Sequence, residues 1–322
     1  MIDGYWGLSL NILSIFFVSL WISLSLISVT TPSISAQLIR FHAQAKLRIL
    51  WCLVILPWLI CLASIWLLIV PELYSTGPAW LSSVVHWHHI YNFELLSWHG
   101  ASLCVFGVIF SSICLVKLLK AIRANTHLDQ LDFFIANTDR SEGLVVIESE
   151  ECQAFTSGLF SPRSYITSGL QRRLSTLEKT VVAEHELAHA RSHDPLKKYL
   201  FSLFAAFFRR SIAQQLNDDF SLALEQAADE SVLSTVNDGA LISKTLLKVS
   251  RLGYRCADKS EELINCQFSE NPLSLRIRYL LSDNKGQSFP RLLCFFFAMT
   301  VTMLSTLSVD ALHHLLEWPF LH

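Results

Sequence analysis

The chain alternates between long apolar runs and one extended polar stretch. Uncharged stretches within residues 4–39, 49–70, 95–116 and 292–309 suit the hydrocarbon core of a bilayer, which is about 30 Å thick and needs about 20 helical residues. Buried core helices are the alternative, or a signal peptide for the first run. That run is too long for a signal peptide and has no basic residue before it. The pattern therefore predicts four membrane-spanning helices.

The basic residues predict the orientation of these spans. All 25 Lys and Arg residues fall within residues 40–48 or 117–291. Positively charged segments beside a span stay in the cytoplasm, so both segments are expected inside. The loop 71–94 has two acids and no base, so it and both termini are expected outside. The chain then divides into residues 1–116 with three spans, a cytoplasmic domain at 117–291, and 292–322 with the fourth span and a short external tail.

The composition narrows the class of function. Only 16% of the residues are charged and 52% are hydrophobic, whereas about a quarter of an average globular chain is charged. The formal net charge of −2 gives no basic surface for nucleic acid, so we expect no nucleic-acid partner. The predicted cytoplasmic domain holds most of the charge and is where we expect chemistry in water.

One motif in that domain carries metal chemistry. Residues 185–189 read HELAH, and Ser175 with Glu178 forms a capping-box pattern that predicts the start of a helix before them. On a helix, His185 and His189 lie one turn apart on one face, so both imidazoles can bind one metal ion. Glu186 stands beside the first histidine and is the candidate general base.

A catalytic zinc site needs a third protein ligand and an open position for water. Glu225 and Asp229 are four residues apart in a helical pattern, so Glu225 can bind the metal while Asp229 accepts the ring N–H of a metal-binding histidine. A solvated acidic helix face is the alternative reading. His193 competes as third ligand, but it comes too early for the metzincin spacing, where Pro195 stands at the expected position.

The chain resembles the membrane-embedded zinc peptidases of the BlaR/MecR type. The resemblance is carried by the following segments: AFTSGL at 154–159, SPR at 161–163, SGL at 168–170, HELAH at 185–189, DPL at 194–196 and EQAAD at 225–229. Those proteins are antirepressors with three membrane helices before a cytoplasmic gluzincin domain and one after it. The resemblance covers the layout of residues 1–309 but individual motifs only within about 150–235.

The resemblance implies a set of roles and a fold. It places the zinc (Zn2+) ligands at His185, His189 and Glu225, the general base at Glu186, and an aspartate that orients a ligand at Asp229. The implied fold class is an α-helical membrane protein with four transmembrane helices and a mainly helical α+β cytoplasmic gluzincin-type zinc peptidase domain. The implied location is the bacterial inner membrane, as a multi-pass protein.

Two features depart from known patterns. Pro272-Leu273 and Arg276-Ile277 resemble a segment of the related HtpX peptidases, but Asn271 replaces the histidine that precedes the proline there, which leaves the group that stabilises the transition state unassigned. The chain ends at His322, too soon for the external penicillin-binding domain of BlaR and MecR proteins. We therefore expect no recognition of β-lactams by that route.

Three weaker patterns remain open. Residues 144–147 and 165–167 are rich in β-forming residues and are candidate edge strands for an extended substrate. Residues 199–208 are apolar between basic pairs, which fits a helix in the lipid headgroup region or an ordinary core helix. Seven of the 12 histidines fall in the external segments, as a metal or acid sensor or as part of the membrane interface; they are His86, His88, His89, His99, His313, His314 and His322.

The leading hypothesis is a membrane-bound zinc endopeptidase that cleaves a cytoplasmic protein, with a transcriptional repressor as the substrate that the resemblance implies. Its partners are a protein or peptide substrate and the lipid bilayer. One alternative is a signalling receptor in which zinc is structural and the output is not proteolytic. The other is an HtpX-like quality-control protease with many substrates.

Overall fold

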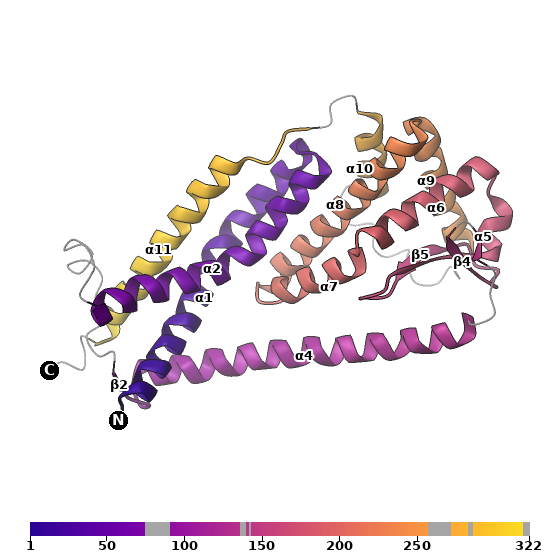
Figure 1. Ribbon diagram of the computed structural model, residues 1–322. Helices are drawn as coiled ribbons and strands as arrows, with labels where there is room; N and C mark the ends of the chain where they lie inside the picture. The colour runs from indigo at the N-terminus through magenta and orange to yellow at the C-terminus, as the bar shows by residue number, and fades with distance from the viewer. Residues whose placement is uncertain (75–90, 136–139, 142, 257–271, 283–285, 318–322) are drawn as a thin grey trace.

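A computed structural model describes residues 1–74, 91–135, 140–141, 143–256, 272–282 and 286–317 (Figure 1). Most of this part of the chain is helical, with short strands before the HELAH segment. The elements in chain order are β1 (Ile2–Asp3), α1 (Tyr5–Gln37), the 3-10 helix η1 (Leu38–Arg40), α2 (Ala43–Tyr74), β2 (Asn92–Phe93), α4 (Trp98–Ile135), β3 (Arg140–Ser141), β4 (Leu144–Ile147), β5 (Ala154–Ser157), β6 (Arg163–Thr167), α5 (Ser168–Arg173), α6 (Thr176–Arg191), α7 (Asp194–Ala205), α8 (Arg210–Val236), α9 (Gly239–Cys256), α10 (Pro272–Leu281) and α11 (Arg291–Glu317).

Four of these helices are long and apolar enough to cross a membrane. The candidate spans are Tyr5–Arg40, Ala43–Ile69, Trp98–Lys120 and Arg291–Leu312. The four spans predicted from the hydrophobic runs are thus confirmed by length and composition. The N-terminus and the last turns of α11 lie at the same end of the molecule (Figure 1), as the predicted topology requires, while the orientation in the membrane stays a prediction.

Helices α1, α2 and α11 pack together through buried hydroxyl groups as well as apolar side chains. Ser19 of α1 lies 3.1 Å from Ser64 of α2 and 3.3 Å from Ser305 of α11, measured between Oγ atoms. Ser64 in turn lies 3.1 Å from the Thr306 hydroxyl. Small polar residues of this kind let membrane helices approach closely and join them by hydrogen bonds that lipid cannot offer.

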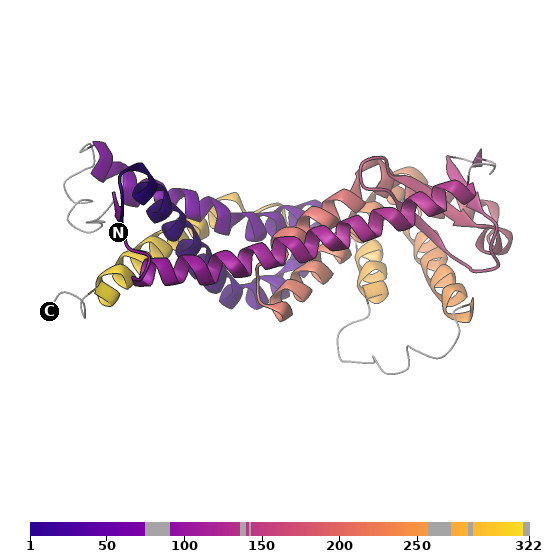
Figure 2. The same ribbon diagram turned by 90° about the horizontal axis from the view of Figure 1, so that it is seen from below.

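Helix α4 is the longest element and runs without a break from the third span toward the sheet (Figure 2). The aromatic ring of Phe110 meets that of Phe17 in α1, with 5.5 Å between ring centroids. The predicted domain boundary after residue 116 falls inside this helix. The division into 1–116, 117–291 and 292–322 therefore stays a prediction about function and exposure to water.

Helix α7 connects the polar domain to the membrane helices. Phe201 stacks on Phe220 of α8, with 4.0 Å between ring centroids, and meets the edge of Trp51 in α2. The next turn brings Phe207 against Trp58, at 5.1 Å between ring centroids. These rings are buried against α2, which is itself a candidate span. Both alternatives for the run at 199–208, a helix in the headgroup region and a core helix, therefore stay predictions.

The four-stranded sheet has the order β3-β4-β6-β5, with β4 and β6 parallel and the other pairs antiparallel. The strands predicted at 144–147 and 165–167 exist, but the prediction that they lie at the edges is wrong. Strand β6 forms a hairpin with β5 on one side and takes β4 on the other, which leaves both predicted strands inside the sheet. Within the described residues, the edge strands are β3 and β5.

Helix α6 lies against this sheet and starts as the sequence predicts. The Ser175 hydroxyl accepts from the Glu178 backbone N–H, and the Glu178 carboxylate accepts from the Ser175 N–H, which completes the capping box. The ammonium of Lys248 lies 2.6 Å from the same carboxylate and holds the pKa of Glu178 below its usual value. The cap therefore fixes both the start of α6 and its contact with α9.

Replacing Ser175 with alanine should destabilise the protein by about 1 kcal/mol, because the first turn of α6 loses a hydrogen-bond acceptor for its free N–H groups. The measurement is the midpoint of thermal unfolding in detergent, which should fall by about 2 °C or slightly more. Thr180→Ala, at an exposed position of the same helix, is the matched control and should leave the midpoint unchanged. Equal midpoints for the two variants would contradict the prediction.

Candidate metal centre

The two histidines of the HELAH segment meet a carboxylate from α8. Their Nε2 atoms are 3.2 Å apart. Glu225 places Oε2 3.2 Å from Nε2 of His185 and Oε1 3.6 Å from Nε2 of His189. One ligand atom from each of the three side chains lies within 4.8 Å of the others. The structure thus brings together the three residues that the sequence predicts as ligands.

This arrangement fits a metal ion better than it fits a site without one. Two imidazole nitrogens 3.2 Å apart repel unless one of them carries a proton, and a cation between them removes the conflict. Although burial opposes it, hydrogen bonds from His185 and His189 hold the pKa of the Glu225 carboxyl well below its usual value. Two imidazoles and one ionised carboxylate are a donor set of catalytic zinc sites.

Each histidine also has a carboxylate behind it, at the ring nitrogen that faces away from the cluster. Asp229 Oδ1 lies 3.2 Å from Nδ1 of His185, outside good hydrogen-bonding geometry but close enough for charge to act. Asp194 Oδ2 lies 2.8 Å from Nδ1 of His189. Burial lowers the pKa of His189, but Asp194 and Glu225 together raise it to about 9. Carboxylates in these positions orient a metal-binding imidazole and raise its basicity.

Sequence reasoning places Asp229 here and misses Asp194. The link between α6 and α7 explains how Asp194 reaches the site. His193 adopts the left-handed backbone conformation, with φ 54° and ψ 41°, which turns the chain sharply so that the next residue faces back toward His189. His193 itself is exposed and does not belong to the converging group. The signal in the sequence is the DP dipeptide at 194–195, which is separated from the end of α6 by two residues and starts α7.

Replacing Asp194 with asparagine should lower the affinity for zinc by about 10- to 100-fold, because the amide lacks the charge that orients His189 and raises its basicity. The measurement is a competition between the purified protein and a chromophoric chelator. Lys197→Met is the control, since Lys197 pairs with the other oxygen of Asp194 at 3.1 Å and does not touch the histidine. Unchanged affinity in Asp194→Asn would show that His189 needs no such partner.

Glu186 is held next to the cluster by the edge of the sheet. The Thr156 hydroxyl on β5 lies 2.9 Å from both Oε2 and the backbone oxygen of Glu186. Ser164 on β6 donates to the same backbone oxygen at 2.8 Å. These hydroxyl groups, which sequence reasoning misses, fix the carboxylate of Glu186 on the side of the site that faces β5.

Arg276 of α10 closes the other side of the site. Its Nε and Nη2 atoms donate to the two oxygens of Asp229 at 2.8 and 2.7 Å, and Nη1 lies 3.1 Å from Oε2 of Glu225. Although burial opposes it, the Arg276 guanidinium holds the pKa of Asp229 below its usual value. The sequence marks Arg276 only through the HtpX-like segment, whose Asn271 lies outside the described residues.

The cluster opens into a cleft of about 1080 Å³. Phe155 and Thr156 of the edge strand β5 line one side, and residues of α6, α7, α8, α9 and α10 line the rest. An extended peptide laid along β5 would pass over Glu186 and the two histidines. Among the residues that the structure describes, the outer edge of β5 has no paired strand, so the cleft offers a polypeptide both a strand edge and the metal-binding group.

The external histidines give no second centre within the described ranges. His99 is buried at the start of α4, where its Nδ1 lies 3.4 Å from the Ser97 hydroxyl. The others fall on residues or side chains outside the described part of the chain, namely His86, His88, His89, His313, His314 and His322. A sensor role for them stays a prediction.

Comparison with known proteins identifies a family. A sequence profile for the family described as BlaR1 peptidase M56 matches residues 78–280, which is more than half of the chain and includes the whole cluster. No curated protein and no solved structure matches the chain.

Proposed function

The chain belongs to the BlaR1 peptidase M56 family, and from that membership we propose that it is a membrane-bound zinc endopeptidase that cleaves a cytoplasmic protein. The observation that carries the proposal is the meeting of His185, His189 and Glu225 at one point beside Glu186. A purely structural zinc site needs no general base. The two-histidine, one-glutamate donor set is that of the gluzincin class, which the resemblance implies.

The residues divide the work as follows. His185, His189 and Glu225 would hold the zinc ion, which when bound would supply Lewis acidity toward a peptide carbonyl and a water molecule at neutral pH. Glu186 accepts a proton from the attacking water and passes it to the leaving amide nitrogen. Thr156 keeps the Glu186 carboxylate directed at the cleft.

Arg276 is the candidate for the group that stabilises the transition state, which the sequence alone leaves unassigned. It is bound to Asp229 and lies beside Glu225, so it neutralises the two carboxylates and fixes α10 against α8. Its guanidinium also lines the cleft, where it can hold negative charge that develops on the substrate carbonyl. The substrate lies as an extended strand along β5.

The membrane topology that we propose rests on the distribution of the basic residues. Residues 117–291 carry the peptidase in the cytoplasm, residues 1–116 and 292–322 provide the four spans, and both termini lie outside. The location is the bacterial inner membrane. The resemblance favours a transcriptional repressor as the substrate.

The test compares cellular protein fragments between wild type and Glu186→Gln by labelling of new N-termini. A regulatory peptidase should produce one or two cytoplasmic fragments that the variant lacks. Many lost fragments from membrane proteins would instead support the quality-control alternative. Identical fragment patterns together with normal signalling would support a receptor with a structural zinc and would contradict the proposal.

A further inference from the structure

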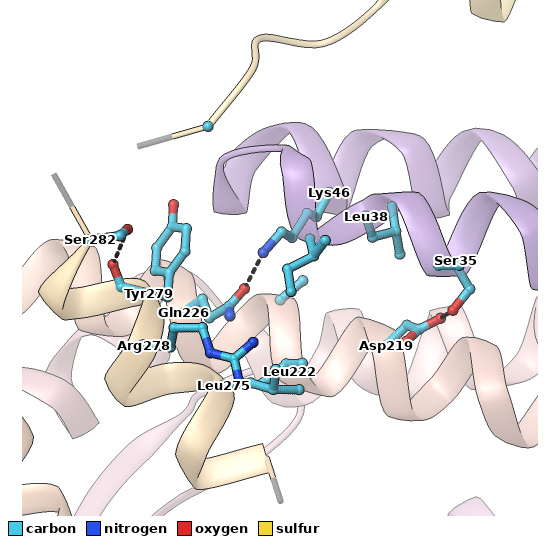
Figure 3. A pocket seen from close by; sticks show the side chains of 14 residues that line it. Ser35, Leu38, Lys46, Asp219, Leu222, Gln226, Leu275, Arg278, Tyr279 and Ser282 are labelled. Atoms are coloured by element: carbon cyan, nitrogen blue, oxygen red, sulfur yellow. Dashed lines mark hydrogen bonds between the residues drawn. The ribbon is translucent and has the colours of Figure 1, made fainter. Parts of the chain in front are cut away.

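A second cavity lies between the turn that joins α1 to α2 and the helices α8 and α10. Its volume is about 400 Å³. The view in Figure 3 shows side chains of Ser35, Leu38 and Lys46 on one side and of Asp219, Leu222 and Gln226 on the other, with Arg278 and Tyr279 of α10 beside them. None of these residues is a proposed metal ligand, so the inference stands apart from the peptidase proposal.

Lys46 brings a buried positive charge to this cavity. The residue is only 6% exposed. Its Nζ donates to Oε1 of Gln226 at 2.7 Å and lies 4.7 Å from the centre of the Tyr279 ring. Within the described residues, no carboxylate lies within ion-pair distance of this ammonium group, and the charges of Glu230 and Asp219 act on it only from farther away. Buried charges are normally paired, so the cavity beside Lys46 is suited to an anion.

The other charged groups of the cavity strengthen this preference. Arg278 is a second base, and Figure 3 shows its guanidinium directed into the space between α10 and Leu222. The acid in the lining is Asp219, which accepts from the Ser35 hydroxyl. Burial raises the pKa of this carboxyl and Asp218 adds to the effect, while the Ser35 hydroxyl and Lys46 oppose it. Glu230 lies nearby but is bound to the Tyr279 hydroxyl.

An apolar groove begins next to the cavity. Its volume is about 1000 Å³, and it runs along α1, α2 and α11 at the ends where Arg40, Lys46 and Arg291 mark the expected inner surface. Leu38 lines both the groove and the cavity. The residues that line the groove include Leu59 and Leu293, whose side chains are 56% and 68% exposed. On a membrane helix, such a surface faces acyl chains.

We infer that the cavity and the groove together bind one phospholipid with an anionic headgroup. The phosphate lies between Lys46 and Arg278, and an acyl chain lies in the groove beside Leu38 and Leu293. A soluble anion would use only the two bases, whereas a lipid uses both features at once. Basic pockets between membrane helices on the cytoplasmic side are suited to anionic headgroups.

The test measures lipid bound to the full-length protein in detergent by native mass spectrometry, with dioleoyl phosphatidylglycerol, dioleoyl phosphatidylcholine and inorganic phosphate as probes. We expect about tenfold preference for phosphatidylglycerol over phosphatidylcholine. Lys46→Met and Arg278→Gln should each weaken phosphatidylglycerol binding about fivefold, in line with about 1 kcal/mol for each base at a membrane surface. Leu293→Trp, which fills the groove, should weaken binding of both lipids equally.

Lys117→Met is the matched control, because Lys117 ends a different span and binds the Ser202 hydroxyl at 2.6 Å; its lipid binding should equal that of wild type. Arg278→Gln and Leu293→Trp keep the test valid if Lys46→Met does not fold. Equal binding of the two lipids by wild type would overturn the inference. Unchanged lipid binding in both Arg278→Gln and Leu293→Trp would also overturn it. Displacement of the lipid by inorganic phosphate would show a site for soluble anions instead.

Discussion

Replacing Glu186 with glutamine should leave zinc bound and lower the rate of peptide cleavage by a factor on the order of 10³. Glutamine has nearly the same shape and can still accept from Thr156, but it cannot take the proton of the attacking water. A positioned general base contributes about 10²- to 10⁴-fold. The measurements are the zinc content of the purified protein and kcat on a peptide derived from the cellular substrate.

Glu184→Gln is the matched control for this variant. Glu184 lies on the same helix one residue before His185 and pairs with Arg191 at 3.1 Å, away from the cluster. Its kcat should equal that of wild type. Full cleavage by Glu186→Gln would remove Glu186 from the mechanism, and loss of zinc from that variant would show that Glu186 helps to hold the metal.

Replacing Glu225 with glutamine should lower the affinity for zinc by more than about 100-fold, which exceeds the 10- to 100-fold effect of removing a residue that only supports a ligand. The amide loses the negative charge that lies between the two imidazoles and beside Arg276. Arg276 then loses one of its two carboxylate partners and keeps Asp229. The measurements are zinc retained after dialysis against a chelator and the cleavage rate, which should fall together.

Glu230→Gln is the control for the second variant, since Glu230 lies on the same helix and binds Tyr279 instead of the cluster. It should keep its zinc. If Glu225→Gln also kept its zinc through dialysis, the third ligand would lie elsewhere. His193, the competing candidate, would then be the next residue to replace.

Local periodicity predicts the helical part of the site. Two histidines four residues apart share one face of any helix, and the capping pattern at Ser175 fixes where that helix starts. Glu225 and Asp229 follow the same rule on α8. The packing of α6 against α8 belongs to the tertiary structure. The resemblance to BlaR and MecR proteins implies this packing, whereas the residue spacing alone does not.

The residues that sequence reasoning misses depend on contacts between distant segments. Thr156 reaches Glu186 because β5 is an edge strand, which follows from pairing with β6 and not from the composition of either strand. Asp194 reaches His189 through the left-handed turn at His193, a conformation that few residues other than glycine adopt. Residues 199–208 give the same sequence pattern for a core helix and for an interfacial one, and their contacts with Trp51 and Trp58 of the candidate span α2 suit both.

Helix α4 has 38 residues and is therefore about 57 Å long. In a straight helix of that length, a small change of tilt at one end produces a large displacement at the other. If the whole helix were tilted by roughly 5° about its outer end, the inner end would move by about 5 Å, which is more than the 3.2 Å between the Nε2 atoms in the metal cluster. Strand β3 is the next element in the chain after this helix. A small tilt of α4 at the outer surface of the membrane would therefore displace the chain beside the sheet at the inner end of the helix.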